Sequence, residues 1–218
     1  MRRNAGEEGD AMANGTPAYP ATLDIDYPDR ELDRVTSLLR PLTVVPIAVV
    51  LALLSQPAVE DGSHQWAGGG GILFLATALL LVFRRKYPRW WFDWNLAFTR
   101  FALRVAAYLA LLRDEYPSTD EEQAVHVGLP YPDAPRELDR WLPLVKWFLA
   151  IPHYVVLALV GVVAVCCVVI AWFAILFTGR YPRPLFDFVV GALRWWLRVA
   201  AYAFLLTTDR YPPFRLEP

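Results

Sequence analysis

Long apolar blocks alternate with polar segments along this chain. Residues 35–54 form a 20-residue apolar segment interrupted only by Arg40, and residues 66–83 add 18 residues without a charge. A third block, residues 141–177, is 37 residues long and carries Lys146 as its only charge. Segments of about 20 apolar residues are long enough to cross about 30 Å of hydrocarbon. The pattern therefore predicts membrane helices.

The third block is too long for one upright span, because 37 helical residues would extend about 55 Å. In one interpretation Pro152 kinks the helix, so that 141–151 lies along the interface and 153–177 spans the membrane. In the other, the block folds as a hairpin near Gly161. A bare apolar turn in lipid would leave backbone groups unsatisfied, which favours the kinked helix.

The sequence also repeats itself. Residues 30–34 recur unchanged as 136–140, and residues 87–112 align without gaps to 181–206, with 14 of 26 positions identical. Shared hydrophobicity alone does not give this many identities, so we expect a tandem duplication. The predicted fold is an all-α integral membrane protein with a polar tail (1–26), a first unit (27–117), a polar linker (118–130) and a second unit (131–214).

Basic residues predict the topology. Arg84-Arg85-Lys86 follows the second apolar segment, whereas residues 55–65 contain no Lys or Arg. By the positive-inside rule, loops 84–90 and 178–184 face the cytoplasm and 55–65 faces out. This predicts a multi-pass protein of the inner (plasma) membrane, with four to six spans and a cytoplasmic N-terminus.

A Tyr-Pro pair opens one helix in each unit, and we expect it to act as a structural turn, because proline suits the first helical turn. The pairs are Tyr87-Pro88 and Tyr181-Pro182. Four residues of the following helix share one side of it through spacings of 7, 4 and 4. They are Asp93, Arg100, Arg104 and Tyr108 in the first unit and Asp187, Arg194, Arg198 and Tyr202 in the second.

The arginines of this face are candidates for binding lipid or an anion: Arg100, Arg104, Arg194 and Arg198. The helices either lie flat with the arginines among headgroups or cross the membrane with the arginines turned inward. Aromatic residues crowd their first two turns, which favours the interface. Since Arg104 lies about 16 Å along the axis from Asp93, its partner is a headgroup phosphate, a carbonyl or a residue of the other unit.

The chain shows no pattern of enzyme chemistry. It lacks a Ser-His-Asp order, a glycine-rich phosphate loop and paired carboxylates within the apolar blocks, and its two cysteines are adjacent inside an apolar block. The net charge of −1 argues against a nucleic-acid partner. We expect a non-enzymatic membrane accessory or scaffold without cofactor or metal, which binds the bilayer, anionic lipid, a membrane protein or its own copy. The alternative is a small transporter or channel for an anionic solute, with the four arginines lining a path between the halves.

Residues of the second unit resemble the DUF4389 family of uncharacterised bacterial membrane proteins. The resemblance rests on residues 140–147, Ile151-Pro152-His153-Tyr154, residues 172–182 and residues 209–214. The first unit departs from the family pattern, with Phe83-Arg84-Arg85-Lys86 in place of Phe-Thr-Gly-Arg. The resemblance implies a membrane protein with two tandem copies of the domain, and it supplies no activity and no catalytic residue.

Overall fold

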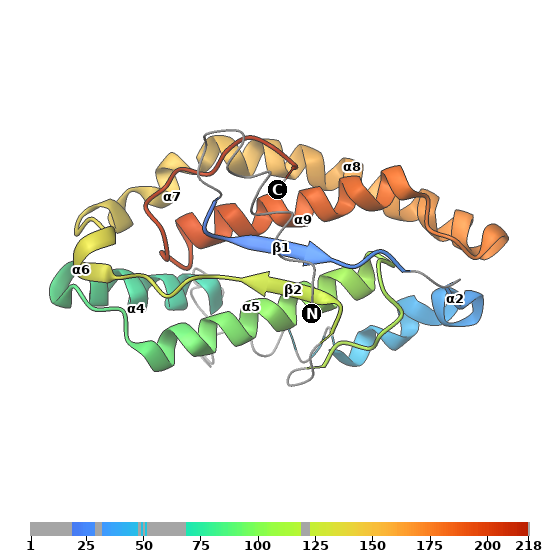
Figure 1. The fold of residues 1–218 in the computed structure, drawn as a ribbon, viewed down its shortest axis with the longest axis horizontal. Helices are drawn as coiled ribbons and strands as arrows, with labels where there is room; N and C mark the ends of the chain where they lie inside the picture. The colour runs from blue at the N-terminus through green and yellow to red at the C-terminus, as the bar shows by residue number, and fades with distance from the viewer. Residues whose placement is uncertain are drawn as a thin grey trace, which may run out of the picture.

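A computed structural model describes residues 19–28, 32–47, 49, 51, 69–118 and 123–217. Most of the described chain is helical, and Figure 1 shows two long helix pairs on either side of a short strand pair. The elements in chain order are β1 (Thr22–Ile25), α2 (Arg34–Thr43), α4 (Gly69–Arg84), α5 (Arg89–Leu109), β2 (Val125–Gly128), α6 (Ala134–Glu137), η1 (Leu142–Leu144), α7 (Lys146–Leu149), α8 (Ile151–Thr178) and α9 (Arg183–Ala203).

The strand pair corrects the prediction of an all-α fold. β1 falls in the predicted polar tail and β2 in the predicted linker, and the two pair antiparallel with Leu23 opposite Val127. Burial alternates along β1, where Leu23 and Ile25 are buried while Asp24 is exposed. This two-residue period is typical of a half-buried strand, but a four-residue strand shows it only twice in the sequence.

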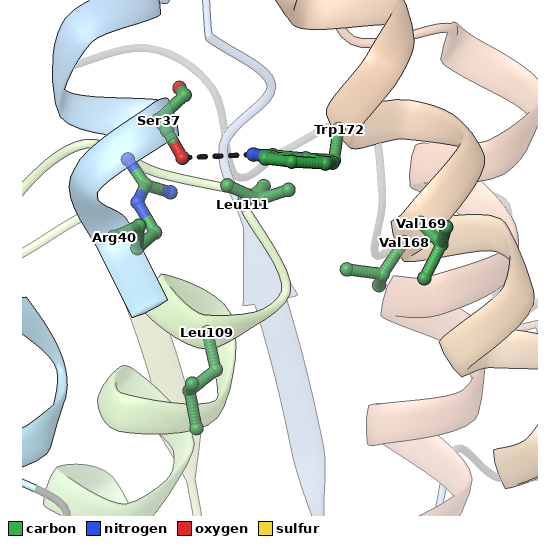
Figure 2. Close-up of a pocket in the computed structure, with 7 residues that line it drawn as sticks. All are labelled: Ser37, Arg40, Leu109, Leu111, Val168, Val169 and Trp172. Carbon is green, nitrogen blue, oxygen red and sulfur yellow. Dashed lines mark hydrogen bonds between the residues drawn. The ribbon is translucent and has the colours of Figure 1, made fainter. Parts of the chain in front are cut away.

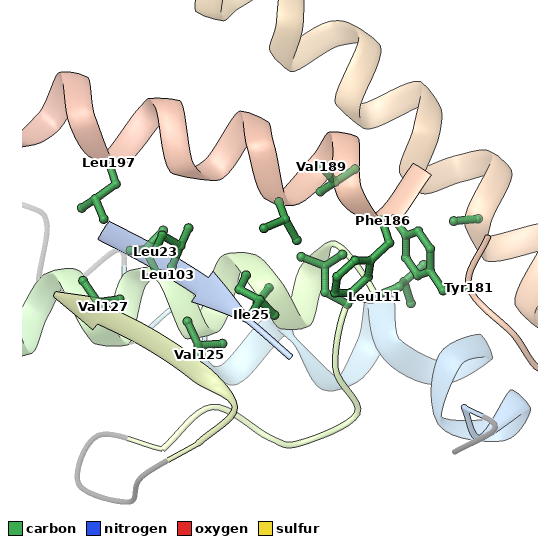
Figure 3. Packing of buried hydrophobic residues seen from close by; sticks show 14 of the residues in the cluster. Leu23, Ile25, Leu103, Leu111, Val125, Val127, Tyr181, Phe186, Val189 and Leu197 are labelled. Carbon is green, nitrogen blue, oxygen red and sulfur yellow. The ribbon is translucent and has the colours of Figure 1, made fainter. Parts of the chain in front are cut away.

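The strands lie on the two helices that follow the Tyr-Pro turns. We count each strand with the unit that it precedes in the chain. β1 then packs against α9 and β2 against α5, so each strand rests on the helix of the other unit (Figure 1). Figure 3 shows Leu23 and Val127 of the strands near Leu103 of α5 and Leu197 of α9. These side chains belong to the main hydrophobic core, so the burial of the strands couples the two halves of the chain.

A long helix begins directly after each Tyr-Pro pair. Pro88 and Pro182 have ψ angles of 133° and 123°, and each caps the first turn of a 21-residue helix. Both helices are followed by a non-glycine residue in the left-handed region, Leu111 with φ 62° and Leu206 with φ 56°. Residues 87–112 and 181–206 therefore begin and end alike.

The 37-residue block contains one long helix. η1 and α7 precede it, and α8 then runs unbroken for 28 residues, with Pro152 in its first turn and Gly179 as a left-handed cap with φ 73°. Gly161 lies inside this helix, so the hairpin interpretation is wrong and the chain breaks just before Pro152 instead. A glycine suits the cap because it has no Cβ to clash at positive φ.

The first unit differs in its apolar segments. Within the described residues, α8 is the one helix long and apolar enough to cross a membrane. α4 has 16 residues, which extend about 24 Å, short of the roughly 30 Å of a hydrocarbon core. The predicted outward loop 55–65 lies outside the described residues.

Candidate functional site

Arg100 and Arg194 hold the two strands. The Arg194 guanidinium donates from Nε to the Leu23 carbonyl of β1 at 2.9 Å, and Arg100 donates from Nη2 to the Val127 carbonyl of β2 at 3.4 Å. Leu23 and Val127 face each other across the strand pair. Backbone carbonyls need donors when they leave water. The first arginine of each helix therefore ties the other unit's strand to the helix.

The second arginine of each helix binds carbonyls of the segment that follows its own unit. The Arg198 side chain is 2% exposed and donates to the carbonyls of Arg215 at 3.2 Å and Glu217 at 2.6 Å. Arg104 donates to the Ser118 carbonyl at 2.7 Å. Burial lowers the pKa of Arg198 to about 10, and the nearby positive charges of Arg215 and Arg194 add to this effect. These contacts are structural, and lipid or anion binding by the four arginines stays a prediction.

The aspartates of the same face serve other contacts. Asp187 is exposed and lies 4.0 Å from Arg183, one turn away on α9, and Asp93 is exposed on α5. The nearest carboxylate to Arg194 is Asp24 of β1, at 3.9 Å. Of the three predicted kinds of partner, backbone carbonyls supply the shortest contacts to the arginines.

Each Tyr-Pro turn contacts a tyrosine that opens the other unit. The Tyr27 hydroxyl donates to the Tyr181 carbonyl, and the Tyr131 hydroxyl donates to the Tyr87 carbonyl. The guanidinium carbon of Arg183 lies 4.6 Å from the centre of the Tyr27 ring, and that of Arg89 lies 5.3 Å from the centre of the Tyr131 ring. Cations at such distances are attracted to the face of the ring, so both turns recognise the opposite unit in the same way.

A buried ion pair lies at the start of the apolar segments in each unit. Arg40 pairs with Asp114, and Lys146 pairs with Asp209 at 2.7 Å. Each cation also lies over a tyrosine ring, with 4.5 Å from Arg40 to the Tyr108 centroid and 5.2 Å from Lys146 to that of Tyr202. Burial lowers the pKa of the Lys146 ammonium, which Asp209 partly opposes.

One face of α8 is apolar and exposed along most of the helix. His153, Ala171 and Ile175 are buried on the inner face, whereas outer side chains such as Leu159 and Val162 are each 65% exposed. The same face also exposes Cys166, Ala158 and further large apolar side chains: Val155, Val163, Val165, Val169, Ile170, Phe173 and Phe177. A contiguous apolar patch of this kind indicates contact with a membrane or another protein.

A groove follows α8 on its side toward α5. It consists of two adjoining cavities of about 390 Å³ and 260 Å³, which share Leu109, Val168 and Val169 as walls. Figure 2 shows the smaller cavity between α2 and α8, with Ser37 and Arg40 on one wall and Trp172 on the other. The Trp172 indole donates to the Ser37 carbonyl at 3.0 Å and closes that end. We refer to the two cavities together as the α8 groove.

The sequence interpretation missed several residues of these networks. Tyr27 and Tyr131 open matching Tyr-Pro-Asp triplets, and Asp114 and Asp209 each precede a closing Tyr-Pro pair by two residues. Recurrence at matching positions is the signal that could have found them. Their carbonyl and cation partners could not have been found in this way, because the partners lie far away along the chain.

The comparison with protein families finds a match to about a third of the chain. Residues 141–215 match the family described as Domain of unknown function (DUF4389). The match runs from just before η1 to the tail beyond α9, and it is a single copy, so the two tandem copies implied by the resemblance are not confirmed. No curated protein and no solved structure matches the chain.

Proposed function

We propose that the chain is a non-enzymatic membrane module of two related units, held on the surface of a bilayer by the outer face of α8 and by basic residues that bind anionic lipid. In this role it acts as an accessory or scaffold protein at the membrane. The observation that carries the proposal is the uncovered apolar face along the 28 residues of α8. Such a face gains free energy when lipid replaces water around it.

Matching contacts support a duplicated origin for the two units. The ion pairs at Arg40 and Lys146 occupy equivalent positions in the aligned sequences, as do the tyrosine contacts of Tyr27 and Tyr131. Leu23 and Val127 are also equivalent, because they face each other in the strand pair and their carbonyls bind matching arginines. We therefore propose a tandem duplication whose halves are related by a two-fold axis through this strand pair.

The polar groups of the strands favour an orientation with α8 along the membrane. The strand pair lies on the far side of α9 from α8 and runs alongside the first half of α8 (Figure 1), and the side chains of Asp24 and His126 are 72% and 61% exposed. If α8 crossed the bilayer, these side chains would come to hydrocarbon depth, where a charged residue costs about 2.5–3.5 kcal/mol on insertion scales. An apolar face dipped into one leaflet avoids this cost. This orientation replaces the predicted multi-pass bundle in our proposal.

The same orientation explains the basic turns. The turn between α4 and α5 lies at one end of the molecule and the turn between α8 and α9 at the other (Figure 1). Arg84, Arg85 and Lys86 are exposed at the first turn, and Arg180 and Arg183 at the second. If α8 lies along the cytoplasmic leaflet, both turns reach the same layer of anionic headgroups, and each basic residue contributes about 1 kcal/mol.

The alternative of an anionic pathway has less support. Arg100, Arg104, Arg194 and Arg198 all donate to backbone carbonyls, and Arg198 is almost fully buried. A residue that lines a conducting path must exchange these contacts for the solute. The arginine contacts instead fit a static role in holding strands and tails.

Vesicle flotation tests the proposal. The purified chain should float with phosphatidylglycerol-containing vesicles, and the double variant Leu159→Lys/Val162→Lys should bind at least about tenfold more weakly, equivalent to about 1.4 kcal/mol. The matched control is His126→Lys, which adds a charge at an exposed position of β2 and should float as the wild type does. Undiminished flotation of the α8 variant would overturn the role of this face.

A further inference from the structure

The α8 groove has the shape and chemistry of a site for a hydrocarbon chain. Its larger cavity is walled by aliphatic side chains of α5, α8 and α9, among them Ala106, Leu157, Ala164 and Leu193. Such walls offer few hydrogen-bond partners to water, so an apolar group gains free energy when it displaces water from the groove. The combined volume of the two cavities falls within the range of small-molecule sites.

The length of the groove also fits a lipid tail. Its walls on α8 extend from Leu157 to Trp172, which corresponds to about 22 Å along the helix axis. One leaflet provides about 15 Å of hydrocarbon, so an extended acyl chain can follow the groove over most of its length. Val165 and Val169 line the groove and are also exposed on the outer face of α8. The groove therefore opens onto the face that we assign to the bilayer.

We propose that the α8 groove holds one acyl chain of a membrane lipid, drawn in from the leaflet along the outer face of α8. This inference rests on the proposed membrane role of α8. The bound chain would fill the gap between α5 and α8 and replace the contacts that close packing of these helices would otherwise supply.

Two buried polar residues lie at one end of the groove. Ser37 and Arg40 line this end and are 0% and 2% exposed. Within the described structure, the Ser37 hydroxyl and the Arg40 Nε are buried without a hydrogen-bond partner, and unsatisfied buried groups are costly. Asp114 already neutralises Arg40. The charge at this end is therefore already balanced within the protein, which suits an uncharged hydrocarbon chain better than a carboxylate.

Gly161 provides a direct way to fill the groove. It lines the larger cavity, and a Cβ placed on it would meet no atom within 4 Å. Gly161→Phe therefore enters open space, and replacing a glycine within a helix also favours the helix. The matched control is Ala158→Phe, which adds the same ring to α8 at an exposed position that lines neither cavity.

The experiment uses the full chain on phosphatidylglycerol vesicles that contain phosphatidylcholine with a photoreactive diazirine on its acyl chain. After irradiation, mass spectrometry maps the labelled residues. We expect the lipid to label residues 106–110 of α5, and Gly161→Phe to reduce this labelling about tenfold, equivalent to about 1.4 kcal/mol. Ala158→Phe should leave it unchanged.

Flotation of the same samples separates the two proposals. If the wild type floats but Gly161→Phe leaves the α5 labelling unchanged, the groove proposal fails and the membrane role stands. If chemical cross-linking joins residues 106–110 to residues 52–68 of the same chain, the chain fills its own groove, and the groove proposal again fails alone. If the wild type does not float, the membrane role fails and the groove proposal fails with it.

Discussion

The two units place different cations in the same buried position. Arg40 donates to the carbonyls of Tyr108 and Arg113 and to the carboxylate of Asp114. Lys146, its counterpart, donates to the Thr208 carbonyl at 2.8 Å and pairs with Asp209. The position thus requires a cation that joins the start of the apolar segments to the end of the arginine helix. The guanidinium meets this need with one more carbonyl contact than the ammonium does.

The units also differ beside this position. Ile47 packs on Phe101 in the first unit, whereas the equivalent His153 accepts a hydrogen bond from Trp195 at 3.2 Å and stacks on Phe214. Phe214 belongs to the C-terminal tail, which also supplies the carbonyls that Arg198 binds. Within the described residues, the second unit thus has a docked tail and an aromatic cluster around the buried His153 that the first unit does not show.

The largest expected effect comes from removing the buried cations. Arg40→Met leaves the Asp114 carboxylate without its cation, and Lys146→Met does the same to Asp209. Each variant should lower the free energy of unfolding by about 3–5 kcal/mol. Arg40→Met should cost more, because it also leaves two carbonyls without their donor. Denaturant unfolding in mild detergent measures both variants. A loss below about 1 kcal/mol, typical of an exposed pair, would show that the pairs are not buried as described.

A second test uses the docked tail, which only one unit has within the described chain. A Cβ on Gly191 would lie 2.9 Å from the Leu216 Cβ and 3.0 Å from its carbonyl oxygen. Gly191→Ala should therefore push the tail away and cost about 1–3 kcal/mol. The equivalent residue of the first unit is Ala97, which is exposed, and Ala97→Gly should cost only about 1 kcal/mol through helix propensity. Thermal unfolding compares the two, and equal small losses would contradict the docking of the tail.

A third test compares the paired tyrosine contacts. Tyr27→Phe and Tyr131→Phe each remove one donor to a carbonyl of the opposite turn, and each should cost about 1 kcal/mol. The double variant should lose the sum, because distant sites without shared partners add. Chemical unfolding of the three variants tests this expectation. A loss confined to one tyrosine would show that the two turns are not equivalent.

The smallest effect concerns pH. The Asp139 carboxylate accepts hydrogen bonds from the backbone N–H groups of Trp141 and Leu142, which hold its pKa below the usual value. The folded state therefore keeps this stabilisation above the unfolded pKa of about 3.9 and loses it as the pH falls through the folded value. Unfolding curves between neutral pH and pH 3 should show a shallower acid loss for Asp139→Asn than for the wild type. Identical curves would show that the Asp139 carboxylate does not stabilise the folded state.

The sequence predicted the elements of this fold better than their contacts. The spacing of Arg100, Arg104 and Tyr108 indicated a helix, and the Tyr-Pro pairs marked its start, because both signals are local. The strands were not predicted, because four residues give too short an alternation of buried and exposed positions. In addition, the strands are stable only where the other unit covers them. The carbonyl partners of the arginines were not predictable, because every residue has a carbonyl and only the fold decides which one lies within reach.

If α8 lies along one leaflet, as we propose, both basic turns lie on the same side of the membrane. Single cysteines at Lys86→Cys and Arg180→Cys, in a chain carrying Cys166→Ala and Cys167→Ala, allow a direct measurement. The protein is added to sealed phosphatidylglycerol vesicles and treated with a membrane-impermeant maleimide. The account predicts that both cysteines react fully without permeabilisation. If one of them reacts only after the vesicles are opened, α8 crosses the bilayer and the account is wrong.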